Sequence, residues 1–187
     1  MKKVFATVVL AVLALAGTTA VLSAQEKTTM VGGQAMYPSK DIVDNAVNSA
    51  DHTTLVAAVK AAGLVETLKG PGPFTVFAPV NSAFGKLPQG TVETLLKPEN
   101  RTTLVKILTY HVVPGRLSTA ALRKQIRAGK GQATLKAVSG GTLTVMMNGE
   151  ENLIVQDEKG NVANLTISNV NQSNGMIQVI DTVLLPN

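Results

Sequence analysis

Two histidines, His52 and His111, are the only imidazoles in a chain of 187 residues. Hydrolysis of the Ser-His-Asp type needs one of them beside a nucleophilic serine. The G-x-S-x-G turn that exposes such a serine is absent, and only Ser82 is predicted to lie between a strand and a helix. His52 follows a predicted helix cap, where we expect it on the surface. The sequence therefore favours a protein that is not an enzyme, with a hydrolase that depends on His111 as the competing hypothesis.

Other reactive groups are scarce. The chain has no Cys, which excludes disulfides, thiolate nucleophiles and Cys-ligated zinc or iron–sulfur clusters. With two His, a metal site would depend mostly on carboxylates, and no second His or acid lies at ligand spacing from His111. Residues 70–73 place prolines where a phosphate-binding loop needs backbone donors. We therefore expect no catalytic residue, no metal site and no cofactor.

A basic stretch is the remaining chemical feature. No acid occurs between Arg116 and Glu150, and Arg123 and Arg127 are four positions apart, so they share one face of a predicted helix. This face could contact an anionic partner, and the alternative is a solvated face without a partner. Arg116, Arg123 and Arg127 are therefore candidate partner-binding residues.

The elements that must position these residues change in type along the chain. In the first half, apolar residues recur at helical spacing and are separated by turn-forming residues. Helices are predicted at residues 39–46, 51–62, 64–68, 81–87, 91–96, 98–109 and 118–126, with Ser39, Asp51, Asn81 and Ser118 as N-terminal caps. A β-rich run at residues 74–78, stopped by Pro79, lies among these helices.

In the second half the apolar period becomes two, which is typical of strands. Gly140-Gly141, Asn148-Gly149 and Lys159-Gly160-Asn161 separate the strands and indicate hairpin turns. The run at residues 74–78 must join this sheet from a distance in sequence. The chain is therefore predicted to be α+β, with helices concentrated in the N-terminal half.

Residues 1–24 are typical of a secretory signal peptide. Lys2 and Lys3 precede an apolar run over residues 4–16, and small residues lead to a cleavage site after Ala24, or alternatively after Ala20. The run is short of the ~20 apolar residues that span a bilayer, although a retained anchor is the alternative. Removal of the segment lowers the formal charge from +5 to +3 and leaves no integral membrane span.

The mature chain is predicted to be secreted, in the periplasm or outside the cell. Residues 25–37 are small and polar and are expected to form a flexible leader, followed by one domain at residues 38–187. Secretion and the scarcity of aromatic residues, with four Phe, two Tyr and no Trp, argue against a nucleic-acid partner.

Three segments carry a resemblance to a known family. They are residues 75–84, with Phe77, Pro79, Asn81 and Phe84; residues 108–115, with Tyr110 and His111; and residues 174–186, with Gly175 and Asp181. In order and spacing they resemble the three signatures of the fasciclin (FAS1) domain family, over about residues 38–186. One position departs from the pattern, because Gln178 stands where the family commonly carries His.

The resemblance implies a wedge of two β-sheets with a helical layer, and a non-enzymatic role in adhesion or surface interaction. It also implies Tyr110 and His111 as candidates for partner contact. From the residues alone we favour a structural role, in which the ring nitrogens of a buried His111 bond to backbone or to the amide of Asn81.

The function expected is that of a bacterial adhesion protein with one fasciclin-like domain, acting as a monomer. Its partner would be an extracellular protein, a polysaccharide or a component of the membrane surface. The alternative is a periplasmic carrier of a small molecule or lipid, with an apolar cleft between the helices and the sheet.

Overall fold

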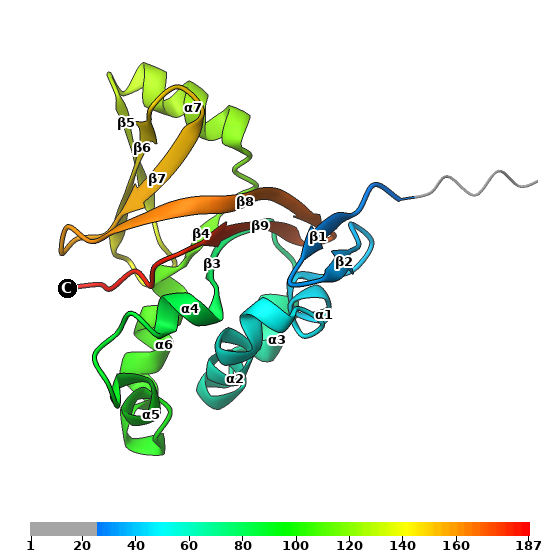
Figure 1. Cartoon of the computed structure of the whole chain (residues 1–187), viewed down its shortest axis with the longest axis vertical. Helices are drawn as coiled ribbons and strands as arrows, with labels where there is room; N and C mark the ends of the chain where they lie inside the picture. The colour runs from blue at the N-terminus through cyan, green and yellow to red at the C-terminus, as the bar shows by residue number, and fades with distance from the viewer. Residues whose placement is uncertain (1–25) are drawn as a thin grey trace, which may run out of the picture.

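The computed structural model describes residues 26–187, so the predicted signal peptide lies outside the described residues. Helices dominate the first half and strands the second (Figure 1). The strands are β1 Thr29–Val31, β2 Gln34–Met36, β3 Phe74–Pro79, β4 Val112–Pro114, β5 Gln132–Lys136, β6 Thr142–Asn148, β7 Asn152–Gln156, β8 Val162–Gln172 and β9 Gly175–Ile180. The helices are α1 Ile42–Ala46, α2 Thr53–Ala62, α3 Val65–Lys69, α4 Asn81–Phe84, α5 Thr91–Leu95, α6 Arg101–Tyr110 and α7 Thr119–Ala128, with 3-10 turns at Ala50–His52 and Pro98–Asn100.

Seven strands form one mixed sheet in the order β4-β3-β9-β8-β7-β6-β5. β3 runs parallel to β9, with Phe74 opposite Gly175, and every other neighbouring pair in this sheet is antiparallel. Beyond β5, the Val138 N–H donates to the carbonyl of Val112 in β4 at 2.8 Å. The two edges therefore meet and the sheet is nearly closed.

The prediction of two sheets forming a wedge has to be corrected, because β8 belongs to both halves of this sheet. β8 is 11 residues long, and its pairing with β9 shifts register between Leu165 and Ile167 and again between Ile167 and Val170. Such irregularities bend a strand and increase its twist. The result is one bent sheet, and the only other sheet within residues 26–187 is the β1–β2 hairpin.

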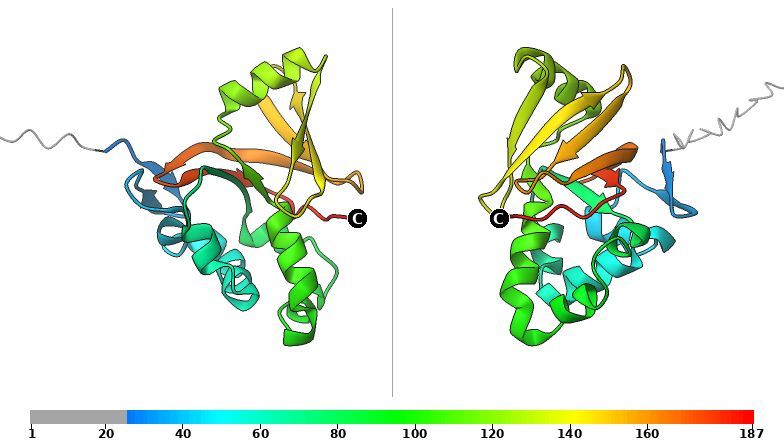
Figure 2. Two further views of the ribbon diagram at one scale, coloured as in Figure 1. Left: turned by 180° about the vertical axis from the view of Figure 1, so that it is seen from behind. Right: turned by 60° about the vertical axis from the view of Figure 1, so that its left-hand side comes forward.

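β3 and β9 separate two apolar cores, because successive side chains of a strand point to opposite faces. Val76 and Ile177 face the helical core, where α1, α2, α3 and α6 pack. Phe77 and Ile180 face the sheet core, which the curled strands β5 to β8 and α7 enclose. Figure 2 shows α1 to α6 on one side of the sheet and α7 at its other end. The predicted helical layer from the N-terminal half is confirmed.

The predicted flexible leader at residues 25–37 is wrong for residues 29–36. They form the β1–β2 hairpin, in which Thr29 pairs with Met36 around a Gly32-Gly33 turn. Val31 and Met36 are buried in the helical core. Burial of these two side chains and the pairing of the two strands both act against the entropy cost of ordering the segment, so the ordered structure begins before residue 38.

The predictions for helix faces and helix ends are correct where the residues that determine them lie within the same helix. α2 buries its predicted apolar stripe and ends at Gly63, and the Ser118 hydroxyl caps α7 by accepting from Ala121 N at 3.2 Å. Ser39 was the wrong choice for α1, since the cap is Asp41, whose carboxylate accepts from Asp44 N at 2.8 Å. Among residues 26–187 no helix is long and apolar enough to cross a membrane.

Candidate functional site

Tyr110 ends α6 and is fully buried in the sheet core. Its hydroxyl donates to the carbonyl of Thr142 at 2.6 Å and accepts from the N–H of Glu158 at 3.1 Å. Burial raises the pKa of Tyr110 to about 12, so the phenol stays neutral. Tyr110 therefore joins α6 to the start of β6 and to the turn between β7 and β8.

His111 is also buried, with 3% of its surface exposed. Its Nδ1 lies 2.8 Å from the carbonyl of Ile107 and its Nε2 lies 3.0 Å from the N–H of Leu184. A carbonyl only accepts and an N–H only donates, so the ring is neutral with the proton on Nδ1. Burial lowers the pKa of His111 to about 4, which agrees with this assignment. The predicted backbone partners are present, whereas Asn81 is not a partner.

The segment after β9 is held by the side chains of His111, Asp157 and Glu158. Together with Tyr110, which supports Glu158, we call them the C-terminal clasp. Asp157 accepts from Leu185 N at 2.9 Å, and Glu158 accepts from Asn187 N at 3.2 Å. Tyr110 in turn holds the backbone of Glu158. Tyr110 and His111 thus stabilise the fold, and both side chains are buried from solvent.

Asn81 caps a helix other than its own. Its Oδ1 accepts from Thr54 N in the first turn of α2 at 3.0 Å, and its Nδ2 donates to Ala50 O at 2.8 Å. α4 begins at Asn81 but has no side-chain cap, and Asp51 does not cap α2. Asn81 is therefore a helix cap as predicted, but it caps α2 and not α4, because the fold brings its side chain to a helix end that is remote in sequence.

Four other residues of the family signatures have structural surroundings. Phe77 is in the sheet core, Phe84 packs against the helical core, and Pro79 is buried at the end of β3. At Gly175 a Cβ would lie 2.2 Å from the carbonyl oxygen of Phe74, so only glycine fits beside β3. These four positions shape the two cores and the pairing of β3 with β9.

Asp181 follows β9 and is held by Asn164. Its carboxylate accepts from the backbone N and from Nδ2 of Asn164 at 2.9 and 3.0 Å, and Lys86 Nζ lies 3.8 Å away. Burial opposes ionisation, but these hydrogen bonds outweigh it and the pKa of Asp181 is lowered. The carboxylate therefore joins β8 to the end of β9, as the favoured structural interpretation predicts.

Gln178 is fully buried, and its uncharged side-chain amide has a hydrogen-bond partner at both its nitrogen and its oxygen. Its Nε2 donates to Leu117 O at 2.9 Å and its Oε1 accepts from Asn169 N at 2.9 Å. The amide therefore connects β9 to β8 and to the segment that leads into α7.

His52 is buried as well, which corrects the expectation of a surface residue. Its Nδ1 lies 2.9 Å from the hydroxyl of Ser49, and burial lowers its pKa. Ser82 is exposed while both imidazoles are buried, so no Ser–His pair faces solvent in the described part of the chain. Residues 26–187 also contain no group of three or more His, Cys, Asp or Glu side chains that could hold a metal ion.

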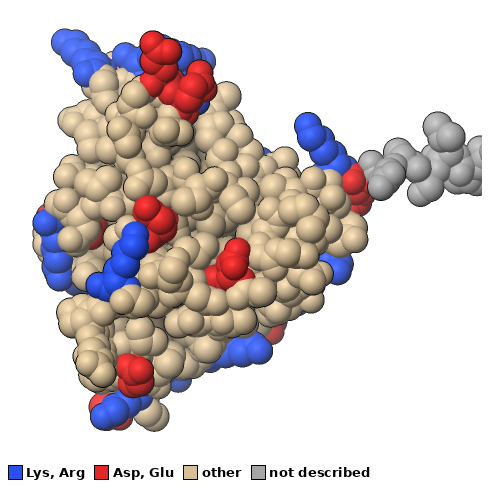
Figure 3. All heavy atoms as spheres, in the orientation of Figure 1, with Lys and Arg blue, Asp and Glu red and all other residues tan. Residues whose placement is uncertain are grey.

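The three candidate arginines lie in different surroundings. Arg123 and Arg127 lie on α7 as predicted, but Arg123 forms an ion pair with Glu151 at 3.0 Å. Arg116 donates to Gln172 O at 2.8 Å near the β8–β9 turn. Arg127 is exposed, and no ion pair of its side chain occurs within residues 26–187. Figure 3 shows basic side chains at the top of the molecule, over α7, with acidic ones beside them.

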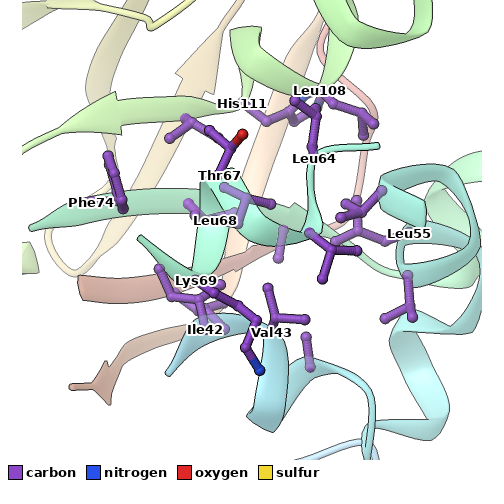
Figure 4. A pocket seen from close by; sticks show the side chains of 18 of the residues that line it. Ile42, Val43, Leu55, Leu64, Thr67, Leu68, Lys69, Phe74, Leu108 and His111 are labelled. Carbon is purple, nitrogen blue, oxygen red and sulfur yellow. The ribbon is translucent and has the colours of Figure 1, made fainter. Parts of the chain in front are cut away.

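An apolar cavity of about 290 Å³ lies between α1 to α3 and the end of α6, with β3 along one wall (Figure 4). Leu55 and Leu68 line it from α2 and α3, Leu64 lines it from the link between these helices, and His111 borders it. The carrier hypothesis predicted an apolar cleft between helices and sheet but named none of its residues. The apolar stripe of α2 was the available signal, because Leu55 and Val59 lie in both the stripe and the cavity wall.

Comparison with known proteins agrees with this fold. The family model for the fasciclin domain matches residues 50–186. A solved structure of a FAS1 domain pair from the insect cell adhesion molecule fasciclin I has a TM-score of 0.70, at 16% identity, and the match covers 86% of this chain and 58% of that one. At this identity the similarity shows the fold alone.

Bacterial relatives are more similar in sequence. Protein sll1483 of Synechocystis is 47% identical over 163 residues, which cover 86% of this chain and 82% of that protein. Immunogenic protein MPB70 of Mycobacterium bovis is 36% identical over 146 residues, or 75% and 66% of the two chains. Cell surface glycolipoprotein MPB83 of the same species is 34% identical over 161 residues, or 83% of this chain and 64% of that protein.

Proposed function

Because the chain belongs to the fasciclin domain family, we propose that it is a non-enzymatic binding protein that contacts a component of the cell surface or matrix outside the cytoplasm. The predicted signal peptide supports this location, as does the name of MPB83, a cell surface glycolipoprotein. The names of the relatives identify no partner for this chain, so the contact surface has to be inferred from its own residues.

The burial of both imidazoles is the observation that carries the proposal. His111 has both ring nitrogens bonded to backbone, and His52 is closed off from solvent. General acid–base chemistry requires a titrating nitrogen that is free to reach the substrate, whereas both nitrogens of His111 are occupied by backbone groups and the His52 ring is buried. This counts against the hydrolase hypothesis and leaves the outer surface for interaction.

The surface around α7 is the contact region that we favour. Lys124, Arg127 and Lys130 are exposed at the C-terminal end of this helix, where Arg123 is the only basic residue paired with an acid. An anionic surface would be attracted to this cluster, and the attraction would be screened by salt. A polysaccharide, an acidic protein or an anionic lipid surface each has this charge.

The test measures binding of residues 25–187 to an immobilised uronic-acid polysaccharide and to phosphatidylglycerol vesicles. Lys124→Glu with Arg127→Glu should weaken binding at least about tenfold, since each basic residue near an anionic surface contributes ~1 kcal/mol. Lys97→Glu with Lys159→Glu makes the same charge change elsewhere and should retain most of the affinity. Equal affinity of both double variants, or binding insensitive to salt, would refute a contact at α7.

The carrier hypothesis also has a specific observation in its favour, the apolar cavity beside α2 and α3. It concerns a different part of the molecule from α7, so the two functions are compatible and can be tested separately.

A further inference from the structure

The apolar cavity is not explained by a surface contact at α7. α1, α2 and α3 form one side, and Leu108 and Val112, at the end of α6 and in β4, form the other. Figure 4 shows Ile42, Leu55, Leu68 and Phe74 around the space between these elements. The cavity is partly open to solvent, and its volume of about 290 Å³ far exceeds the water-sized voids of close-packed protein interiors.

The cavity also lowers the folding stability that this domain could gain from packing. The chain has no Cys, so its stability depends on packing without disulfides. Val43, Leu64 and Phe74 line the cavity and remain only partly buried, although they pack against the helical core. An apolar ligand would complete the burial of these side chains.

Part of the rim of the cavity is apolar. Val47 and Val138 both line it, and each is 46% exposed. They are two of the five large apolar side chains that are exposed within residues 26–187. Exposed apolar side chains that border a cavity would contact the hydrocarbon of a ligand where it meets solvent.

Charged side chains line the cavity at one side only. Lys69 is paired with Asp44 and with Asp41, the latter at 3.5 Å. Lys60 also lines the cavity, from α2, and no ion pair of Lys60 occurs within residues 26–187. An anionic group at the end of an apolar chain would neutralise Lys60 and leave the existing pairs of Lys69 intact.

We propose that this cavity binds a single-chain amphiphile of the long-chain carboxylate class, with its hydrocarbon between α2, α3 and β3 and its carboxylate beside Lys60. The volume is at the lower end of the ~300 to 1,000 Å³ found for small-molecule sites, which fits one chain better than two. This function is independent of the surface contact at α7.

The first experiment measures the Kd of sodium alkanoates of eight to fourteen carbons by titration calorimetry, below their micelle concentrations. Each buried methylene contributes ~0.8 kcal/mol, so Kd should tighten about fourfold for each added carbon and then level off once the cavity is full. Absence of saturable binding for every chain length would overturn the proposal.

Two substitutions then test the position of the hydrocarbon. Val47→Trp covers the rim at an exposed position, and Val56→Phe fills the cavity from α2. Both should weaken dodecanoate binding at least about tenfold while thermal unfolding confirms that the variants are folded. Unchanged affinity in folded Val47→Trp and Val56→Phe would overturn the assigned site. Polysaccharide binding should persist in both, which keeps this test separate from that of the α7 surface.

The last experiment tests the carboxylate. Lys60→Glu should weaken dodecanoate roughly fivefold to tenfold and leave dodecanol unchanged, whereas Lys97→Glu should change neither. An equal effect of Lys60→Glu on the acid and the alcohol, or no effect on either, would overturn the placement of the head group.

Discussion

The pH dependence of unfolding tests whether His111 is a neutral, buried link. In the folded chain its pKa is lowered by burial to about 4, whereas an unfolded chain has the ordinary pKa near 6.5. Between these values the unfolded state binds more protons, so stability falls as the pH falls. The contribution of His111 is therefore full above about pH 6.5 and lost by about pH 4. At 1.36 kcal/mol for each pH unit, the loss amounts to about 3 kcal/mol.

His111→Gln separates titration from hydrogen bonding. A glutamine amide can donate to Ile107 O and accept from Leu184 N, as Gln178 donates and accepts elsewhere in the core, but it does not titrate. We expect this variant to lose ~1 to 2 kcal/mol at pH 7 through altered packing, and to unfold with a shallower pH slope. His111→Ala should lose ~3 to 5 kcal/mol at pH 7, since two buried backbone groups lose their partner and a cavity forms.

Urea unfolding followed by circular dichroism between pH 4 and 7.5, at constant ionic strength, measures these free energies. The quantity to plot is the difference between wild type and His111→Gln, because His52 and the carboxylates titrate in both proteins and cancel. The proposed neutral state of His111 would be refuted if the free energy of unfolding of wild type and His111→Gln changed with pH at the same rate. Its structural role would be refuted if His111→Ala were as stable as wild type at pH 7.

Two further substitutions test the positions of Tyr110 and Asn81. Gly141→Ala places a Cβ 2.6 Å from the Tyr110 ring, and should lower the free energy of unfolding by ~1 to 3 kcal/mol in urea titrations; a neutral effect would mean that the ring moves freely. Asn81→Ala should cost ~1 kcal/mol or more through loss of the cap on α2, whereas Asn81→Asp retains the acceptor for Thr54 N and should lose less, as the midpoints of thermal unfolding will show. Equal losses in the two Asn81 variants would contradict the capping role.

Sequence patterns predict a helix or strand when the apolar spacing and cap residues that specify it lie within that element. The alternating apolar residues of β5 to β7 point into the sheet core, and Ser118 caps its own helix. The β1–β2 hairpin was missed because each strand has three residues and one buried side chain. The Gly32-Gly33 pair, a typical two-residue hairpin turn, was the signal that could have found it.

The partners of the site residues could not be predicted in the same way. Asn81 bonds to Thr54, 27 positions away, and His111 bonds to Leu184, 73 positions away. No periodicity connects such positions, because the tertiary fold brings them together. Burial of His52 has the same origin: Ala46, Ala78 and Val170, from α1, β3 and β8, line a small space beside it. Residue types therefore indicated which polar residues would have a structural role, but the partners of those residues could be identified only from the structure.

The parallel pairing of β3 with β9 has a consequence for how the polypeptide assembles. β9 follows every other strand along the chain, yet it lies between β3 and β8 in the sheet. The face against which α1, α2 and α3 pack is therefore incomplete until β9 has emerged from the ribosome. Pairings so distant in sequence form slowly, because the intervening chain must first be closed into a loop. The C-terminal clasp, which holds the segment after β9, can close only after this last strand is in place.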